Sequence, residues 1–267
     1  MKIKKEIKLM FSWVLIATYI FVALSFVDTQ KEQVLCLDID VDVVDTTGNY
    51  FIESKGAIDI LTQGNFNLMG YPVYKINTLD VENTIKNYPS VKDARAFCSY
   101  KGDLSIEITQ RRPILRVINY NGESYYIDET GAMMQWSPNY TAKVLVASGN
   151  INEPFESRYS VNVEKATEDD EFGRGKILSD LYKLALVIDS DDFWKAEIQQ
   201  IYIDENSDII MIPIVGIHKI LFGSLENYEK KFRKLKQFYK TGITKKGWNK
   251  YSQINLKYEN QIVCTKK

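Results

Sequence analysis

Few side chains in this sequence have the types and spacing that catalysis requires. The only histidine, His218, lies between apolar neighbours, which favours a structural role over metal ligation. No HExxH, GxSxG or Ser-x-x-Lys motif occurs, and residues 173–176 lack the spacing and the hydroxyl residue of a P-loop. The acidic runs at 168–171 and 189–192 are typical of solvated loops. The sequence therefore predicts no catalytic residues and no cofactor.

Metal binding is also weakly supported. The aspartates of segment 38–42 could suggest a calcium loop, but Val43 stands where an EF-hand loop needs glycine. The cysteines, Cys36, Cys98 and Cys264, form an odd and sparse set without metal-ligand spacing. We therefore predict no metal site. The residues leave open whether Cys36 and Cys98 form a disulfide or are small buried apolar residues.

The composition is that of a folded protein without a global preference for nucleic acid. Apolar residues make up 45% and charged residues 26% of the 267 residues, and the net charge is -1. This net charge is the sum of two oppositely charged segments and the rest of the chain. Residues 151–212 have 15 acidic and 6 basic side chains, whereas residues 225–267 have 3 acidic and 12 basic ones. The blocks complement each other within one domain or keep it soluble, and the sequence does not show whether the basic block has a partner.

An uncharged apolar run extends from Leu9 to Val27 and follows several lysines. As a helix it would rise roughly 28 Å, close to the thickness of the hydrocarbon core of a bilayer. The alternative is a cleaved signal peptide, whose apolar region is shorter and ends in small residues, whereas Phe26 continues this run. We therefore predict a transmembrane helix at 9–27 after a cytoplasmic stub at 1–8. Because lysines favour the cytoplasmic side, the remainder should be extracytoplasmic.

After a linker at 28–34, residues 35–112 are predicted to form a small α+β unit. Apolar alternation predicts the strands, while capping signals and helical periodicity predict the helices. The predicted elements are a strand at 35–43, helices at 54–61 and 78–88, and strands at 91–99 and 104–111. The order strand, helix, helix, strand, strand resembles that of a POTRA domain. POTRA units bind other polypeptides, so this resemblance implies a binding function.

A second unit, residues 113–264, is predicted to be a mostly antiparallel β domain with flanking helices, followed by a tail at 265–267. Pro113 marks its start, because proline can begin a strand but not lie inside one. The predicted strands are 114–118, 125–127, 132–134, 144–146, 198–203, 209–214 and a terminal strand within 251–263, and the predicted helices are 176–188 and 224–242.

Four motifs occur in order along the chain. They are Gln110-Arg111-Arg112-Pro113-Ile114, Tyr125-Tyr126-Ile127-Asp128-Glu129-Thr130-Gly131, Ile220-Leu221-Phe222-Gly223 before a helix with Lys231, Leu235 and Phe238, and Ile254-Asn255-Leu256-Lys257-Tyr258. With these motifs and the apolar run, nearly the whole chain resembles the bacterial cell-division family FtsQ (DivIB). The chain departs from the family's pattern at Lys257, where many members have arginine, and in its short stub.

The resemblance implies a non-catalytic bitopic scaffold that recruits other cell-division proteins to the septum. Its expected location is the bacterial inner (cell) membrane, with the later domains periplasmic or extracytoplasmic. The expected partners are divisome membrane proteins that resemble FtsB and FtsL, and neither nucleic acid nor a small-molecule substrate is expected. The alternative is a membrane-anchored envelope enzyme with a site of scattered carboxylates and tyrosines. A deep polar pocket with convergent carboxylates would favour the enzyme.

The terminal strand is the predicted partner site. Between Ile254 and Val263 there is no proline, and only Lys257 and Glu259 are charged, so few features oppose strand addition. We expect partner binding by β-augmentation, with Tyr258 as the anchor. The predicted partner-binding residues are Tyr251, Gln253, Ile254, Leu256, Lys257, Tyr258, Asn260 and Ile262. The alternative is that the apolar residues among them only complete the core.

Overall fold

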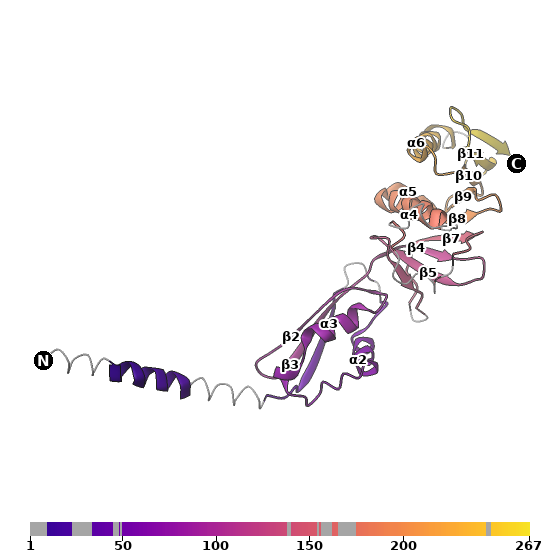
Figure 1. Ribbon diagram of the computed structural model, residues 1–267. Coiled ribbons are helices and arrows are strands. Elements are labelled where there is room, and N and C mark those ends of the chain that lie inside the picture. Colours follow the sequence, from indigo (N-terminus) through magenta and orange to yellow (C-terminus); the bar gives the residue numbers. More distant parts are fainter. Residues whose placement is uncertain are drawn as a thin grey trace. The chain divides into compact units, whose positions relative to one another are not determined.

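The computed structural model divides into two compact units. The first consists of Met1–Asp45 and Ile52–Gln110, and the second consists of Thr46–Phe51 and Arg111–Lys267. The residues that the structure describes are 10–22, 34–44, 48, 50–137, 140–153, 155, 162–164, 175–243 and 247–267 (Figure 1). The short segment 46–51 thus belongs to the second unit, although both of its neighbours in the sequence belong to the first.

Residues 10–22 are helical, and Thr18 Oγ1 donates a hydrogen bond to the carbonyl oxygen of Val14 at 2.6 Å. Within the described residues, no helix combines the length and the apolar character that a membrane span requires. The predicted transmembrane segment 9–27 is described only at 10–22. The predicted stub 1–8 and the linker residues 28–33 lie outside the described residues.

The first unit has the predicted order of strand, helix, helix, strand, strand, which is therefore confirmed. Its elements are β1 (Asp38–Val44), α2 (Ser54–Gln63), the short 3-10 helix η1 (Val73–Lys75), α3 (Thr78–Lys86), β2 (Val91–Cys98) and β3 (Asp103–Gln110). In the sheet, β3 is central, with β1 parallel on one side and β2 antiparallel on the other. The first strand begins at Asp38 rather than at the predicted residue 35, because Leu35 instead forms an isolated bridge with Pro72.

The core of the first unit lies between its sheet and the two helices. Each helix contributes a pair of buried residues four positions apart, which places both members of the pair on one helix face. Alternate residues of β3 face the same core. These residues are Ala57 and Leu61 of α2, Val81 and Ile85 of α3, and Leu104, Ile106 and Ile108 of β3. The apolar periodicity of the sequence is therefore satisfied by one continuous core.

The second unit contains a larger sheet. Its elements are β4 (Pro113–Ile118), β5 (Ser124–Asp128), β6 (Met133–Gln135), β7 (Leu145–Gly149), α4 (Gly175–Ser190), α5 (Asp192–Glu197), β8 (Ile198–Ile203), β9 (Ile209–Pro213), β10 (Lys219–Gly223), α6 (Tyr228–Phe238), the π-helical turn η2 (Tyr239–Ile243), β11 (Tyr251–Asn255) and β12 (Val263–Lys266). The strand order is β12-β11-β10-β9-β8-β7-β4-β5-β6. Antiparallel pairs predominate, and the parallel pairs are β4–β7, β7–β8 and β10–β11.

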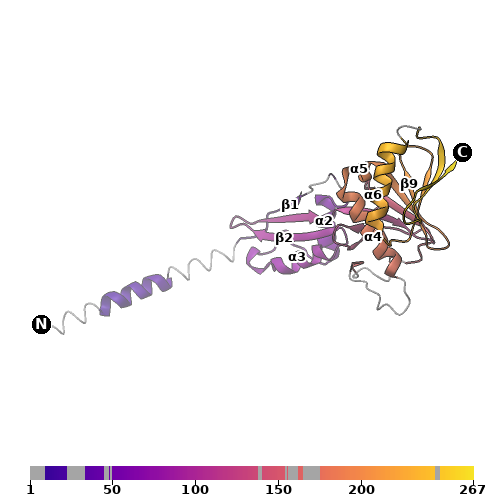
Figure 2. The same cartoon turned by 90° about the horizontal axis from the view of Figure 1, so that it is seen from above.

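The helices of the second unit pack against one face of its sheet, as Figure 2 shows for α4, α5 and α6. Leu181 and Leu184 of α4, Trp194 of α5 and Leu235 of α6 are buried in a single core with the inward residues of the strands. The aromatic rings of Trp194 and Phe232 lie 5.2 Å apart between centroids, which joins α5 to α6. This core extends along the sheet as far as β11, where it includes Ile254.

Helix α5 is not predicted by the sequence patterns. The acidic run 189–192 was expected to be a solvated loop, but Asp191 caps a helix because its Oδ1 accepts a hydrogen bond from Phe193 N at 3.0 Å. The start of α6 also differs from the expectation. Asn227, with a φ of 54°, is its N-cap, whereas Ser224, where the predicted helix begins, accepts a hydrogen bond at its carbonyl oxygen from Lys231 Nζ at 2.7 Å.

Candidate partner-binding site

The sheet of the second unit ends at β12, not at the strand that the sequence indicated. Strand β11 lies between β10, to which it is parallel, and β12, to which it is antiparallel. The prediction that Ile254–Tyr258 is an open terminal edge is therefore wrong. The chain turns after Asn255 and returns as β12, and among the described residues no strand lies on the far side of β12.

The apolar residues of β11 are held in the core. Ile254 pairs with Ile220 of β10 on one side and with Cys264 of β12 on the other. Leu256 follows the strand and donates its backbone N–H to the carbonyl oxygen of Leu221 at 2.9 Å. Ile254 and Leu256 are fully buried, and Tyr251 is nearly so. These three predicted site residues therefore have buried side chains that anchor β11 and the adjoining β12 to the core.

The loop between β11 and β12 presents the exposed members of the predicted set. Lys257, Tyr258 and Asn260 are exposed, and Tyr258 has 49% of its surface in solvent. Gln253 is exposed on β11, while Ile262 is partly buried against the core. The eight predicted residues thus divide between a buried support and an exposed surface at one end of the sheet.

Two lysines fix the conformation of this loop. Lys234 Nζ, from α6, donates to the carbonyl oxygens of Tyr258 at 2.6 Å and of Glu259 at 3.0 Å. Lys257 Nζ forms an ion pair with Asp208, and the backbone N–H of Lys257 donates to Asn255 Oδ1 at 2.9 Å. These contacts do not involve the ring of Tyr258, which is exposed.

Helix α6 is attached beside this edge by a buried cation. Lys231 is buried, donates to the Ser224 carbonyl, and has its Nζ 4.9 Å from the centre of the Phe222 ring. Burial lowers the pKa of Lys231, and the nearby Glu226 carboxylate acts in the opposite direction. Lys236, on the same helix, pairs with Asp191 at 2.6 Å. Part of the basic block therefore serves the packing of α6.

The terminal strand β12 was not predicted as a separate strand. Val263, Cys264 and Thr265 have side chains typical of strands, and residues 262 and 264 are partly buried whereas 263 and 265 are exposed. The residue types of this short segment were the available signal. The segment is followed by Lys266 and Lys267, so it was assigned to the preceding strand and a tail.

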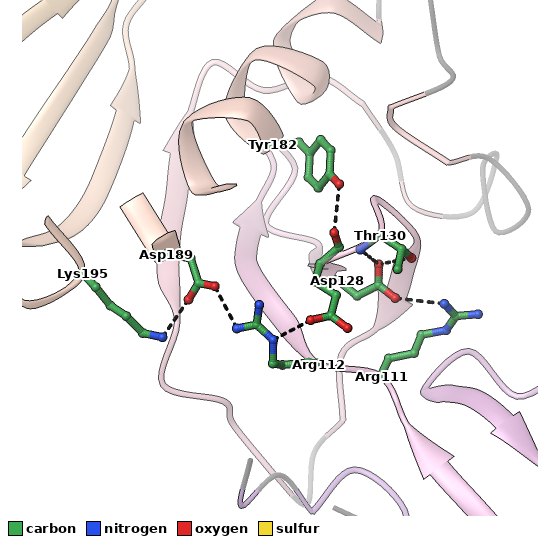
Figure 3. Close-up of polar contacts among 8 residues, drawn as sticks. Arg111, Arg112, Asp128, Thr130, Tyr182, Asp189 and Lys195 are labelled. Atoms are coloured by element: carbon green, nitrogen blue, oxygen red, sulfur yellow. Dashed lines mark hydrogen bonds and ion pairs between the residues drawn. The ribbon is translucent and has the colours of Figure 1, made fainter. Parts of the chain in front are cut away.

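A second polar cluster surrounds the predicted junction at Arg111-Arg112, within the second unit (Figure 3). Arg111 Nη1 lies 2.9 Å from Asp128 Oδ2, and the other Asp128 oxygen accepts bonds from Thr130 and Ala132 in the β5–β6 turn. Arg112 contacts Glu129 in that turn and Asp189 near the end of α4. The arginines thus fasten the start of β4 to a hairpin and to a helix.

A groove of about 780 Å³ begins beside this cluster. Its lining residues are Arg112, Pro113, Ile114, Arg116, Thr141, Ala142, Lys143, Val144, Leu145, Val146, Ala185, Ile188, Asp189, Lys195, Ile198, Gln199 and Ile214. Asp189 is the single carboxylate in this lining, and it already pairs with Arg112 and Lys195. The convergent carboxylates that would favour an enzyme are not found along this groove.

The buried titratable groups lie elsewhere, in the core. His218 Nε2 and the Tyr239 hydroxyl are 2.8 Å apart, and both residues are buried, as is Glu197. Burial raises the pKa of Glu197 to about 6 and lowers that of His218. Burial also raises the pKa of Tyr239, and the charge of Glu197 adds to this effect. The side chains of these three residues are buried.

The cysteines also show no ligand arrangement. The thiols of Cys36 and Cys98 have pKa values raised chiefly by burial, which is the behaviour of small apolar residues. Among the described residues, no group of three or more His, Cys, Asp or Glu side chains could hold a metal ion.

Two family models match the chain. The model described as FtsQ/DivIB, C-terminal related matches residues 112–265, which is more than half of the chain. The model described as POTRA-like domain matches residues 34–109. No curated protein matches the chain.

Proposed function

The chain belongs to the FtsQ/DivIB family and therefore has a role in cell division, and on this premise we propose that it is a non-catalytic assembly protein that binds partner division proteins along β12. The observation that carries the proposal is that β12 is a terminal strand of the sheet within the described residues. The proposal also includes a membrane anchor at residues 9–27, with the folded units extracytoplasmic and placed at the division septum. The apolar run and the preceding lysines support that anchor.

An unpaired edge can bind an extended segment of another chain. The row of backbone N–H and C=O groups supplies affinity, while side chains on alternate positions supply specificity. Natural proteins usually block such edges with proline or charge. In β12 no proline occurs, and the charge is confined to Lys266 at the end of the strand. Val263–Thr265 thus remain suited to strand addition.

The adjoining loop supplies side chains that a partner could recognise. Tyr258 combines apolar area with a hydroxyl, a combination that is frequent at the centres of protein interfaces. Lys234 and Lys257 hold the loop in one conformation, so binding would need little further ordering of the backbone. The partners expected at this surface are membrane proteins of the divisome that resemble FtsB and FtsL.

Truncation of the full-length chain tests the proposal. Removal of residues 263–267 deletes β12, whereas removal of residues 266–267 keeps Val263–Thr265 and serves as the matched control. After co-expression with the FtsB-like and FtsL-like proteins of the same cell, the first truncation should abolish co-purification from membranes and the second should largely preserve it. Partner recovery that is unchanged without β12 would overturn the proposal.

A double substitution covers the case in which the truncated chain fails to accumulate. Val263→Glu with Thr265→Glu places charge on two exposed positions of β12 and retains its length. The control is Gln135→Glu on β6, which is the other terminal strand of the same described sheet and is also exposed there. Loss of partner with the β12 pair alone supports the proposal, and equal recovery of both variants contradicts it.

A further inference from the structure

Three segments of the first unit are joined by backbone hydrogen bonds near residues 34–37, just before β1. Residues 34–37 bond to residues 70–73, since Cys36 N donates to Tyr71 O at 2.9 Å, Gly70 N donates to Cys36 O at 2.8 Å, and Val73 N donates to Val34 O at 3.0 Å. The β2–β3 turn joins them, because Leu37 N donates to Gly102 O at 2.9 Å. The parallel register of β1 and β3 places this turn beside the start of β1, as can be followed in Figure 2.

The convergence exposes a set of large apolar side chains, here called the Tyr100 patch. Its members are Leu35, Leu37, Met69, Tyr71, Tyr74 and Tyr100. Leu37 and Tyr100 have 67% and 85% of their surfaces in solvent. Leu35 and Leu37 belong to the strand that the sequence predicted at 35–43, yet they precede β1 and are exposed. Grouped exposed apolar side chains of this kind commonly mark a contact surface.

Lysines accompany the tyrosines of the patch. Lys75 Nζ lies 5.4 Å from the centre of the Tyr74 ring, and Lys101 Nζ lies 5.8 Å from the centre of the Tyr100 ring. Tyrosine is enriched at the interface between membrane and water, and lysine side chains there direct their amines toward lipid headgroups. The combination of tyrosine, aliphatic and lysine side chains therefore matches the chemistry of a bilayer surface.

The sequence also limits how far the patch can be from a membrane. The apolar run ends at Val27, and the described part of the first unit resumes at Val34. Seven residues span at most about 25 Å even when fully extended. If residues 9–27 are anchored in a bilayer, Leu35 and the segments bonded to it are held close to the headgroup region of that same bilayer.

We propose that the Tyr100 patch lies against the lipid headgroups of the membrane that anchors the chain, so that the first unit docks on the lipid surface. This inference rests on the proposed anchor, but it adds a second contact that the anchor does not require. The occupant is the lipid surface rather than a protein partner, because the short tether always keeps the patch near lipid and the side chains suit its interface.

The test uses the full chain reconstituted in vesicles without any other protein. Cysteines 36, 98 and 264 are replaced by alanine, and the fluorophore NBD is attached through Tyr100→Cys. The control carries NBD through Tyr88→Cys, an exposed position of the first unit beside the start of β2, which pairs with the end of β3 remote from the patch. With lipids that carry a spin label on the headgroup, emission at position 100 should be blue-shifted and quenched, whereas emission at position 88 should be unchanged.

A second set of variants tests the side chains. Replacing Leu35, Leu37 and Tyr74 by serine should reduce the quenching at position 100, because their apolar contacts with lipid are lost. Equal, weak quenching at positions 100 and 88 in chains that resist extraction by alkaline carbonate would overturn the inference and leave the anchor standing. If alkaline carbonate extracts the chain, the anchor itself fails, and the docking that rests on it fails as well.

Discussion

Arg112 Nη1 lies 2.8 Å from Asp189 Oδ2, which ties the residue before β4 to the C-terminal part of α4. The same guanidinium contacts Glu129 through Nε at 2.7 Å, and Asp189 also pairs with Lys195 at 2.8 Å (Figure 3). Tyr182 of α4 donates its hydroxyl to the Glu129 carbonyl at 3.0 Å. One arginine therefore joins a strand, a turn and a helix that are far apart in the sequence.

Arg112→Ala should lower the free energy of unfolding of the second unit by about 1.5–3 kcal/mol, the range for hydrogen bonds to charged groups. The control is Arg95→Ala, because Arg95 is highly exposed and pairs with Asp93 at 3.7 Å, an interaction worth at most about 1 kcal/mol. Pulse proteolysis of the full chain in urea measures both. A loss for Arg112→Ala no larger than that of the control would contradict the assigned role.

The same contact predicts a dependence on acid. Burial acts to raise the pKa of Asp189, but hydrogen bonds from Lys195 and Arg112 outweigh it and leave the pKa below its usual value. A carboxylate with a depressed pKa stabilises the fold above its unfolded pKa of about 3.9, and this stability is lost as the pH falls further. Asp189→Asn should therefore weaken the protein at neutral pH and narrow its difference from wild type below about pH 4. A constant difference would argue against the pairing.

Glu197 should show the opposite dependence. Its pKa is raised to about 6 by burial, and Oε1 has no hydrogen-bond partner among the described atoms. The neutral form is thus favoured in the fold, so this group's contribution to stability is complete below about pH 4.3 and is lost as the pH rises to 6. Glu197→Gln should stabilise the protein by up to about 2 kcal/mol above pH 6 and by little at pH 4.

The control for Glu197→Gln is Glu205→Gln, at an exposed position in the β8–β9 turn. That change should leave the free energy of unfolding nearly constant across the same pH range. Urea unfolding at pH 4 and pH 7 provides the comparison. A destabilising effect of Glu197→Gln at both pH values would show that the carboxylate has a partner that the substitution removes.

Much of the fold follows from the sequence because apolar periodicity sets the core. The strand–helix–helix–strand–strand order of the first unit and the helix near 176–188 were read from alternation and three-to-four spacing. The helix α5 was missed because its signal is a single capping aspartate, Asp191, ahead of an aromatic pair. Local chemistry was decisive there, and an acidic run resembles a solvated loop unless the cap is recognised.

The candidate site was only partly predictable, because edge position is a property of the whole sheet. Ile254 and Leu256 have the alternation of a strand with one exposed face, but alternation does not show which neighbours lie in the plane of the sheet. The return of the chain as β12 covers the edge of β11 and moves the open edge to residues 263–266. Alternation also extended the first strand too far toward its start. Leu37 lies just before β1, outside the paired strand, and is exposed.

Tyr258 provides the sharpest side-chain test at the proposed interface. Tyr258→Ala should weaken partner binding by about 1–2 kcal/mol, as expected for a tyrosine at an interface, with little change in melting temperature. The fold should persist because Lys234 bonds to the backbone carbonyl of residue 258, which alanine retains. The control is Tyr202→Ala on β8, another tyrosine that is about half exposed. Equal binding by the two variants would place the interface elsewhere.

Topology can be tested independently of partner binding. A reporter that is active only outside the cytoplasm should be active when it is fused after Lys267, because the lysines before residue 9 favour a cytoplasmic N-terminus. The matched control carries the same reporter ahead of Met1 and should be inactive. Activity only in the N-terminal fusion would reverse the proposed orientation.

Phe51 should stabilise the second unit although the sequence places it between β1 and α2. Its ring lies 5.3 Å from that of Tyr126 and 5.0 Å from that of Tyr140, in edge-to-face arrangements. With Tyr126, Met134 and Ala142 it forms a small buried cluster. Deleting a buried phenylalanine side chain typically costs about 3–5 kcal/mol, because contacts are lost and a cavity remains.

Phe51→Ala should therefore accelerate hydrogen exchange in β5 and β6, whereas the amides of α3 and β3 should keep their protection. Phe97→Ala is the matched control, since Phe97 is half exposed on β2 of the first unit and should cost much less. Faster exchange confined to α3 and β3 in Phe51→Ala would assign the residue to the first unit. Because Phe51 is not part of the core of the first unit, residues 35–111 that carry Phe51→Ala should also unfold cooperatively by themselves.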